Sequence, residues 1–96
     1  KAALNSYVKS VSVPLALKGI RINSIAPGNI TFKGSVWSKK TAQNPESVEA
    51  MLANTVPLRK LGSPDDVANL AVWLASDVAN FVTGTIVTTD GGQTRS

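Results

Sequence analysis

The stretch RINSIAPGNI, from Arg21 to Ile30, decides the fold. It begins as an apolar, strand-like segment and ends at Pro27-Gly28, a pair of residues that strongly interrupts regular backbone. It then resumes with Ile30, a residue that favours the protein interior. A buried strand with such an end indicates either an ordinary turn or a place where a ligand comes close to bare backbone.

The segment before this stretch has the pattern of a helix. Apolar side chains recur at three- and four-residue spacing, which predicts a helix from residue 1 to about residue 17 with one apolar stripe, of which Tyr7 is expected to lie in the core. The helix has no capping residue before its first turn and no acidic side chain near the exposed N–H groups. Because an initiator methionine is also absent, this start indicates a cut chain. The stripe consists of Leu4, Tyr7, Val8, Val11 and Leu15.

Two later helices carry complete start signals. Asn44 is expected to cap a helix from Pro45 to Asn54. Ser63 is expected to cap a helix that begins at Pro64, with Asp66 in capping-box position. Asp65 and Asp66 are therefore interpreted as helix-capping carboxylates, not as an acid/base pair.

Strands are predicted for residues 20–26 and 85–89, which gives the order α-β-α-α-β. This alternation favours parallel pairing with helices on both faces. Two parallel strands alone do not make a stable sheet, because each needs further strands beside it. We therefore expect residues 1–96 to be the C-terminal part of one doubly wound α/β domain.

Composition narrows the function classes. The chain has 96 residues, 43% of them hydrophobic, and it contains neither cysteine nor histidine. The sequence therefore predicts no disulfide and no metal site, and it lacks the usual base for catalysis at neutral pH. No apolar run approaches the roughly 20 residues that cross a bilayer. We expect a cytoplasmic protein that does not enter the membrane.

The net charge of +4 is unevenly placed, because seven of the ten Lys and Arg residues precede Glu46. Nucleic-acid binding requires basic residues that cluster and alternate with aromatic ones. Only Lys33, Lys39 and Lys40, near Phe32 and Trp37, approach this pattern. Solvated lysines on a surface loop explain them more simply, so we expect no nucleic-acid partner.

Two long segments carry a family resemblance. KAALNSYVKSVSVPLALKGIRINSIAPGNI resembles short-chain dehydrogenase/reductases from the lysine of their Tyr-x-x-x-Lys motif onward, and LGSPDDVANLAVWLASDVANFVTGTIVTTDGG resembles their C-terminal end. The resemblance implies a Rossmann fold that binds NAD or NADP and transfers hydride to or from a small carbonyl or alcohol substrate. A 3-oxoacyl thioester or a sugar or polyol is the expected substrate class. A homodimer or homotetramer is the expected assembly of the complete enzyme.

Lys1 matches the lysine of the catalytic motif. In the family this lysine hydrogen-bonds the nicotinamide ribose, and its charge lowers the pKa of the catalytic tyrosine. The resemblance thus implies catalytic and cofactor-binding roles for Lys1, with an exposed helix lysine as the alternative. The tyrosine belongs four residues upstream, and Tyr7 is no substitute because no lysine follows it at that spacing.

The Pro27-Gly28 turn matches the family's contact with the nicotinamide ring. The resemblance implies that Pro27 and Gly28 pack on the ring and that the backbone of Ile30 binds the carboxamide. Gly28→Val is therefore expected to weaken cofactor binding far more than folding. The family pattern has threonine two places after this isoleucine, where Phe32 stands here. Thr31 is the candidate to supply that hydroxyl.

Residues 32–56 correspond to the family's substrate lid, interpreted as a loop followed by the helix that Asn44 caps. Asn29, Phe32 and Trp37 are the candidate substrate-binding residues, and packing of the lid onto the body by Trp37 and Met51 is the equal alternative. Further residues that match the family are interpreted as structural: Asn23 as a buried hydrogen-bonding group, Gly62 as a turn, and Asp90, Gly91 and Gly92 as the end of the last strand.

An alternative function is a non-catalytic α/β module that binds partners through the apolar stripe of residues 4–15. A basic nucleic-acid or acyl-chain binder is a third hypothesis. Under the favoured oxidoreductase interpretation, residues 1–96 alone are expected to be inactive, because they lack the glycine-rich phosphate loop, the catalytic serine and the catalytic tyrosine.

Overall fold

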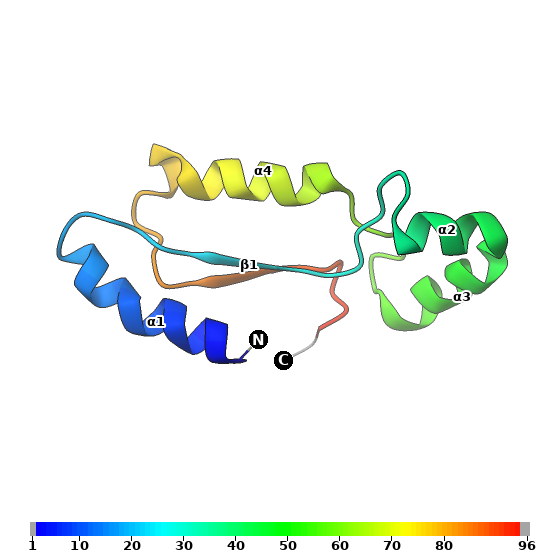
Figure 1. Cartoon of the computed structure of the whole chain (residues 1–96), viewed down its shortest axis with the longest axis horizontal. Coiled ribbons are helices and arrows are strands. Elements are labelled where there is room, and N and C mark those ends of the chain that lie inside the picture. The colour runs from blue at the N-terminus through cyan, green and yellow to red at the C-terminus, as the bar shows by residue number, and fades with distance from the viewer. Residues whose placement is uncertain (1, 95–96) are drawn as a thin grey trace.

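A computed structural model describes residues 2–94 of the chain. Two parallel strands lie between two helices, and a pair of shorter helices projects from one end (Figure 1). No helix within residues 2–94 has the length and apolar character needed to cross a membrane. The elements in chain order are α1 (Ala2–Ala16), β1 (Ser24–Pro27), α2 (Val36–Gln43), α3 (Pro45–Thr55), α4 (Pro64–Ala75), the 3-10 helix η1 (Asp77–Ala79) and β2 (Ile86–Thr89).

The strands pair as the sequence predicts. β1 and β2 are parallel, in a register that runs from Ser24 opposite Ile86 to Pro27 opposite Thr89. α1 and α4 lie on opposite sides of this pair (Figure 1). The carboxyl ends of both strands therefore meet at one edge, the end where ligands bind in open α/β sheets.

β1 is shorter than predicted, because side chains supply part of the pairing before residue 24, where Gly84 N still donates to Ile22 O at 2.7 Å. The Asn23 side chain accepts hydrogen bonds from Thr85 N (3.1 Å) and Thr85 Oγ1 (2.7 Å) and donates one to Val82 O (3.1 Å). Ile22 N donates to Thr83 Oγ1 instead of to a backbone carbonyl. The structural role predicted for Asn23 is confirmed, because its side chain hydrogen-bonds the residues that lead into β2 and so connects the starts of the two strands.

The helix starts follow the capping signals. Asn44 accepts a hydrogen bond from Ser47 N at the start of α3. Ser63 and Asp66 form the predicted capping box at the start of α4. The interpretation of residues 32–40 as a loop is wrong from Val36 onward, because α2 begins there. Ser35 caps α2 by accepting a hydrogen bond from Ser38 N, a local signal that was present in the sequence.

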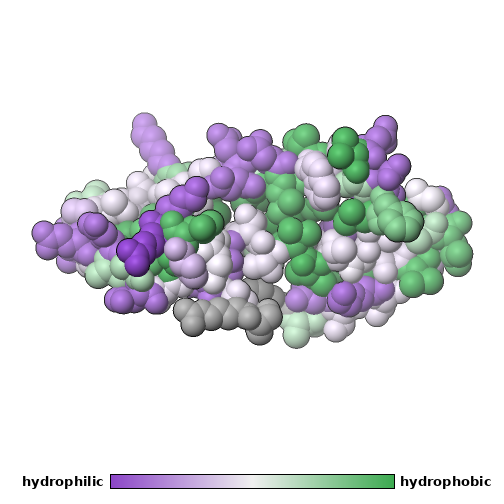
Figure 2. Space-filling view, turned by 180° about the vertical axis from the view of Figure 1, so that it is seen from behind, coloured by the Kyte–Doolittle hydropathy of each residue, from purple (hydrophilic) through white to green (hydrophobic). Residues whose placement is uncertain are grey.

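The core is small and lies around the strands and the base of the projecting helices. Its buried apolar side chains are Val8, Val48, Val56, Leu74 and Ala79. The expectation that Tyr7 belongs to the core is wrong: Tyr7 is 60% exposed, because α1 buries Val8 and Ser12 instead. Apolar surface is prominent over the middle of the molecule and at the end opposite α2 and α3 (Figure 2).

The molecule is elongated because α2 and α3 project from it. Its Cα radius of gyration is 16.1 Å, whereas a compact chain of this length has about 12.5 Å. The two helices pack against each other as a hairpin, which we call the lid hairpin (residues 35–55), and they lie beyond the carboxyl ends of the strands (Figure 1). The hairpin is therefore positioned mainly by the two segments that connect it to the body.

Candidate functional site

A cleft of about 800 Å³ lies at the carboxyl ends of the strands. The start of α1 contributes Ala2 and Asn5, and the end of β1 contributes Pro27, Gly28 and Asn29. The end of β2 and the tail after it form the remaining wall, with Thr88, Asp90, Gln93 and Thr94. Lys1 lies outside the described residues, but its neighbour Ala2 lines the same cleft as Pro27 and Gly28.

Gly28 lies where no side chain fits. Its N–H donates to Thr89 O at 3.0 Å. A Cβ at this position would stand 2.6 Å from Asp90 Cβ and 2.8 Å from Asp90 Cα, closer than carbon atoms approach in proteins. The protein itself therefore requires glycine here, so Gly28→Val is expected to disturb folding as well as the proposed cofactor contact.

The segment after Gly28 pairs with the loop before α4. Ile30 and Gly62 form a parallel bridge, in which Gly62 N donates to Asn29 O (2.9 Å) and Thr31 N donates to Gly62 O (2.8 Å). In such a bridge the groups of the bridging residue itself face the other way. Within residues 2–94, nothing hydrogen-bonds the N–H or C=O of Ile30.

The turn after β2 is built by Asp90, Gly91 and Gly92. The Asp90 carboxylate accepts hydrogen bonds from Gly92 N (2.9 Å) and Thr94 N (2.8 Å). The hydrogen bonds from Thr94, and more weakly those from Gly92, hold the pKa of Asp90 below its usual value. Gly91 and Gly92 adopt positive φ angles of 66° and 92°, which glycine adopts without strain.

This turn also supports the base of the lid hairpin. Leu58 N donates to Gly91 O at 3.0 Å, and a Cβ on Gly91 would stand 2.8 Å from Val56 Cγ1. Gly92 lies close to Pro57, with 3.1 Å between its would-be Cβ and Pro57 Cγ. The structural interpretation of this glycine pair is confirmed, and its role extends to positioning the hairpin.

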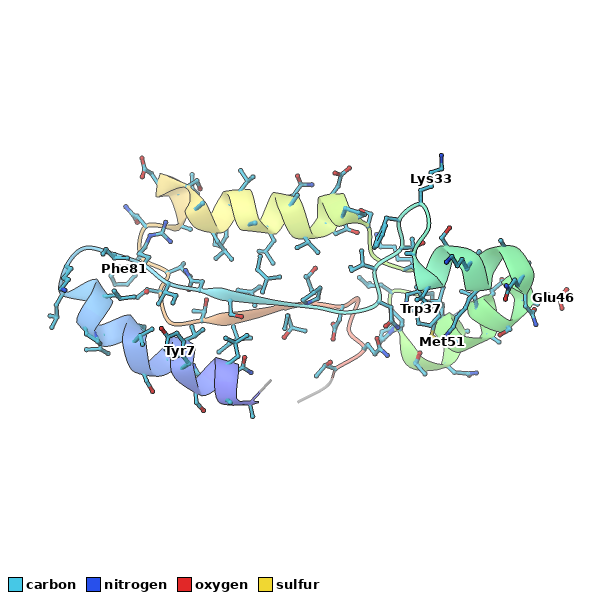
Figure 3. The ribbon with its side chains drawn as sticks, viewed as in Figure 1. Tyr7, Lys33, Trp37, Glu46, Met51 and Phe81 are labelled. Carbon is cyan, nitrogen blue, oxygen red and sulfur yellow. The ribbon has the colours of Figure 1, made fainter. Side chains whose placement is uncertain are left out.

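The structure separates the candidate substrate residues. Asn29 lines the cleft, whereas Phe32 and Trp37 do not line it and Phe32 is largely exposed. Trp37 and Met51 line a hollow of about 370 Å³ between α2 and α3, and both lie within the hairpin in Figure 3. Lys40 Nζ lies 4.7 Å from the Trp37 ring centre, a cation–π distance. This arrangement places Trp37 and Met51 between the two helices of the hairpin, whereas the alternative had them pack the lid onto the body.

Several residues of the cleft were not predicted from the sequence as site residues, Gln93 among them. Asn29 Nδ2 donates a hydrogen bond of 3.3 Å to Gln93 Oε1, so Gln93 faces the candidate site. Gln93 follows the turn that comes after β2, at the edge where ligands bind in parallel sheets, and this position is the only general signal for it in the sequence.

Comparison with known proteins agrees with this geometry. A family model described as enoyl-(acyl carrier protein) reductase matches residues 1–94. Isoepoxydon dehydrogenase patN of Aspergillus clavatus is 50% identical over 92 residues, which are 96% of this chain and 35% of that protein. The chain therefore spans about a third of the length of this curated relative.

Two solved structures share the fold over 99% of this chain. YwfH, an NADPH-dependent reductase involved in bacilysin biosynthesis, has a TM-score of 0.83 and 31% identity, and the match covers 38% of that protein. A 3-oxoacyl-[acyl-carrier protein] reductase with bound NAD from Brucella melitensis has a TM-score of 0.78 and 32% identity, and the match covers 32% of it. The family match and these similarities agree with the Rossmann-type arrangement of strands and helices. The chain therefore belongs to the short-chain dehydrogenase/reductase family.

Proposed function

We propose that the protein containing this chain is an NAD- or NADP-dependent oxidoreductase that interconverts a carbonyl and an alcohol group. Because the chain spans about a third of its relatives, the activity belongs to the whole protein. Family membership supports the reaction class. The names of the similar structures, an NADPH-dependent reductase and a reductase with bound NAD, support the choice of cofactor.

The backbone of Ile30 is the observation that carries the proposal. Its N–H and C=O have no hydrogen-bonding partner within residues 2–94, and they follow directly on the residues that line the cleft. An N–H donor beside a C=O acceptor matches a carboxamide, which offers the complementary pair. The nicotinamide cofactor carries such a carboxamide, so these residues fit it.

Each remaining candidate has a distinct task in this proposal. Pro27 and Gly28 provide a flat contact for the nicotinamide ring, and Pro27 presents no N–H that would be left unpaired there. Thr31 supplies a hydroxyl close to Ile30. Lys1 holds ribose hydroxyls, and its positive charge favours the phenolate of a catalytic tyrosine. The nicotinamide, when bound, supplies or accepts the hydride.

The substrate would enter the cleft beside Asn29. A 3-oxoacyl thioester or a sugar or polyol remains our proposal for its class, and the reductase from Brucella melitensis is named for the first of these. Phe32 and Trp37 reach the substrate only if the lid hairpin moves toward the cleft, as lids do in many enzymes. We further propose a cytoplasmic homodimer or homotetramer.

The test uses the whole protein labelled for NMR. NADH and NADPH are titrated separately, and the backbone amides of residues 28–31 are expected to shift, whereas Ser47 in the lid hairpin serves as a remote reference. Consumption of the reduced cofactor is then followed with 3-oxoacyl thioesters and with oxidised sugars. Absence of binding by both cofactors would contradict the proposal.

A further inference from the structure

Two cavities meet at the end of β2. One is the cleft described above, and the other is a smaller cavity of about 190 Å³ that reaches toward the base of the lid hairpin. The walls of both include Asn29, Asp90 and Gln93. These three residues therefore stand between the two spaces.

The smaller cavity has room for part of a ligand. A cavity of roughly 150 Å³ holds a molecule as large as benzene, so about 190 Å³ accepts a ring or a short chain. Val56 and Leu58 give it an apolar side. Lys60 and Asp66, which carry opposite charges, give it a polar side. This lining suits an uncharged substituent that is mainly apolar and ends in a hydroxyl or carbonyl group.

The three dividing residues differ in how firmly they are held. Asp90 is fixed by two charge-assisted hydrogen bonds of 2.9 and 2.8 Å. Asn29 and Gln93 are joined only by a 3.3 Å bond between exposed carboxamides, longer than the usual 2.7–3.2 Å range. The carboxamide pair is therefore the part of the wall that can open.

We propose that the Asn29–Gln93 pair is a gate that limits the size of the substrate. With the pair closed, the cleft holds a short substrate; with the pair open, a longer substituent extends into the smaller cavity. Asn29 and Gln93 would thus determine specificity without taking part in hydride transfer. This inference rests on the proposed function, because it assumes that the cleft holds the substrate.

The first test measures substrate preference in the whole protein. Gln93→Ala removes the acceptor of the pair, and Gln43→Ala, at the exposed end of α2 in the lid hairpin, is the matched control. We expect Gln93→Ala to raise the kcat/KM ratio of a long to a short ketone substrate about tenfold, whereas the control leaves the ratio within twofold. An unchanged ratio in an active Gln93→Ala enzyme would overturn the gate.

The second test does not need turnover. Hexan-1-ol and propan-1-ol are added to the labelled whole protein, and the amide shifts of Gly62 and Gly91, which line the smaller cavity, are compared with that of Gly28 in the cleft. In Gln93→Ala we expect hexan-1-ol to shift Gly62 and Gly91 at least threefold more than in the wild type. Equal shifts in both proteins, or none in either, would refute the gate.

The two tests separate the two proposals. A wild-type protein that reduces no carbonyl substrate with either cofactor contradicts the proposed function. The amide shifts would still show whether the Asn29–Gln93 pair divides the cavities.

Discussion

Gly28 and Asp90 are in such close contact that neither chain segment can move toward the other. A Cβ on Gly28 would stand 2.6 Å from Asp90 Cβ, and the Asp90 carboxylate is itself held by the turn that follows β2. This contact fixes the carboxyl ends of β1 and β2 relative to each other at the edge of the candidate site.

Gly28→Val should therefore destabilise the fold. The added side chain forces the strand ends apart, and overpacking of this kind costs roughly 1–3 kcal/mol. The free energy of unfolding from urea titration of the whole protein measures the effect. Gly34→Ala is the control: a Cβ there meets nothing within 4 Å, although its φ of +85° introduces some backbone strain. A Gly28→Val protein as stable as wild type would contradict the contact.

Asn23→Ala should also lower stability. It leaves Val82 O without the Asn23 donor and Thr85 N and Oγ1 without the Asn23 acceptor, and unsatisfied groups in a partly buried position cost roughly 1–3 kcal/mol. Asn54→Ala, at an exposed position of α3, should be neutral or slightly stabilising. Urea titration of both variants gives the free energy of unfolding. A decrease in Asn23→Ala without one in Asn54→Ala would show that the hydrogen bonds of Asn23 stabilise the fold.

Arg59 adopts a φ of 55°, the left-handed region that side chains with a Cβ rarely occupy. Relief of this strain, roughly 1–2 kcal/mol, outweighs the greater flexibility of unfolded glycine, roughly 0.5–1 kcal/mol. We expect Arg59→Gly to raise the free energy of unfolding by about 0.5–1 kcal/mol and Arg59→Val to lower it. The reverse order would show that the Arg59 side chain stabilises the turn.

Acid should weaken the start of α4. Hydrogen bonds from Ser63 backbone and hydroxyl, with the charge of Lys60, hold the pKa of Asp66 below its usual value of 3.8. The folded protein therefore binds this proton less readily than the unfolded chain. The stability contributed by Asp66 is present above about pH 4 and is lost as the pH falls through the lowered pKa.

Melting temperatures of the wild type and of Asp66→Asn test this prediction. The variant should melt lower near pH 7, and the difference should shrink below about pH 4. Asp65→Asn is the neighbouring control, because no side-chain hydrogen bond of Asp65 occurs in the described part of the chain. A difference that is constant with pH would contradict a role for the Asp66 carboxylate.

Lys1→Met in the whole protein should nearly abolish turnover. Loss of the ammonium that favours the tyrosine phenolate should lower kcat by roughly 10²-fold or more, with a shift of the pH profile to higher pH. Lys18→Met, in the exposed turn after α1, should keep full activity. Lys1→Met activity within a few-fold of wild type would refute the role that the family resemblance assigns to Lys1.

Features encoded by a few neighbouring residues could be predicted from the sequence. The caps Asn44 and Ser63 were identified because each signal lies within four residues. α2 was missed because Val36 and Trp37 are followed by lysines that show no apolar periodicity, although Ser35 marked its start. Parallel pairing of β1 and β2 followed from the alternation of elements, but the point where β1 begins depends on Asn23 and Thr85, which are 62 positions apart.

The candidate site was predictable in part for the same reason. Pro27, Gly28 and Asn29 lie at the end of a recognisable strand, and the structure places them in the cleft. Gln93 meets Asn29 across 64 positions of sequence, and no local pattern reports such a contact. The distance of Trp37 from the cleft depends on the direction in which the lid hairpin projects, which the connecting segments decide.

The lid hairpin meets the rest of the molecule at two narrow junctions, one where Gly62 pairs with Asn29 and Thr31 and one where Gly91 holds Leu58. We therefore expect that residues between these junctions tolerate exchange for the corresponding piece of a relative while the strands stay unchanged. Transplanted hairpins would thus vary the surroundings of the cleft while the recipient scaffold stays intact.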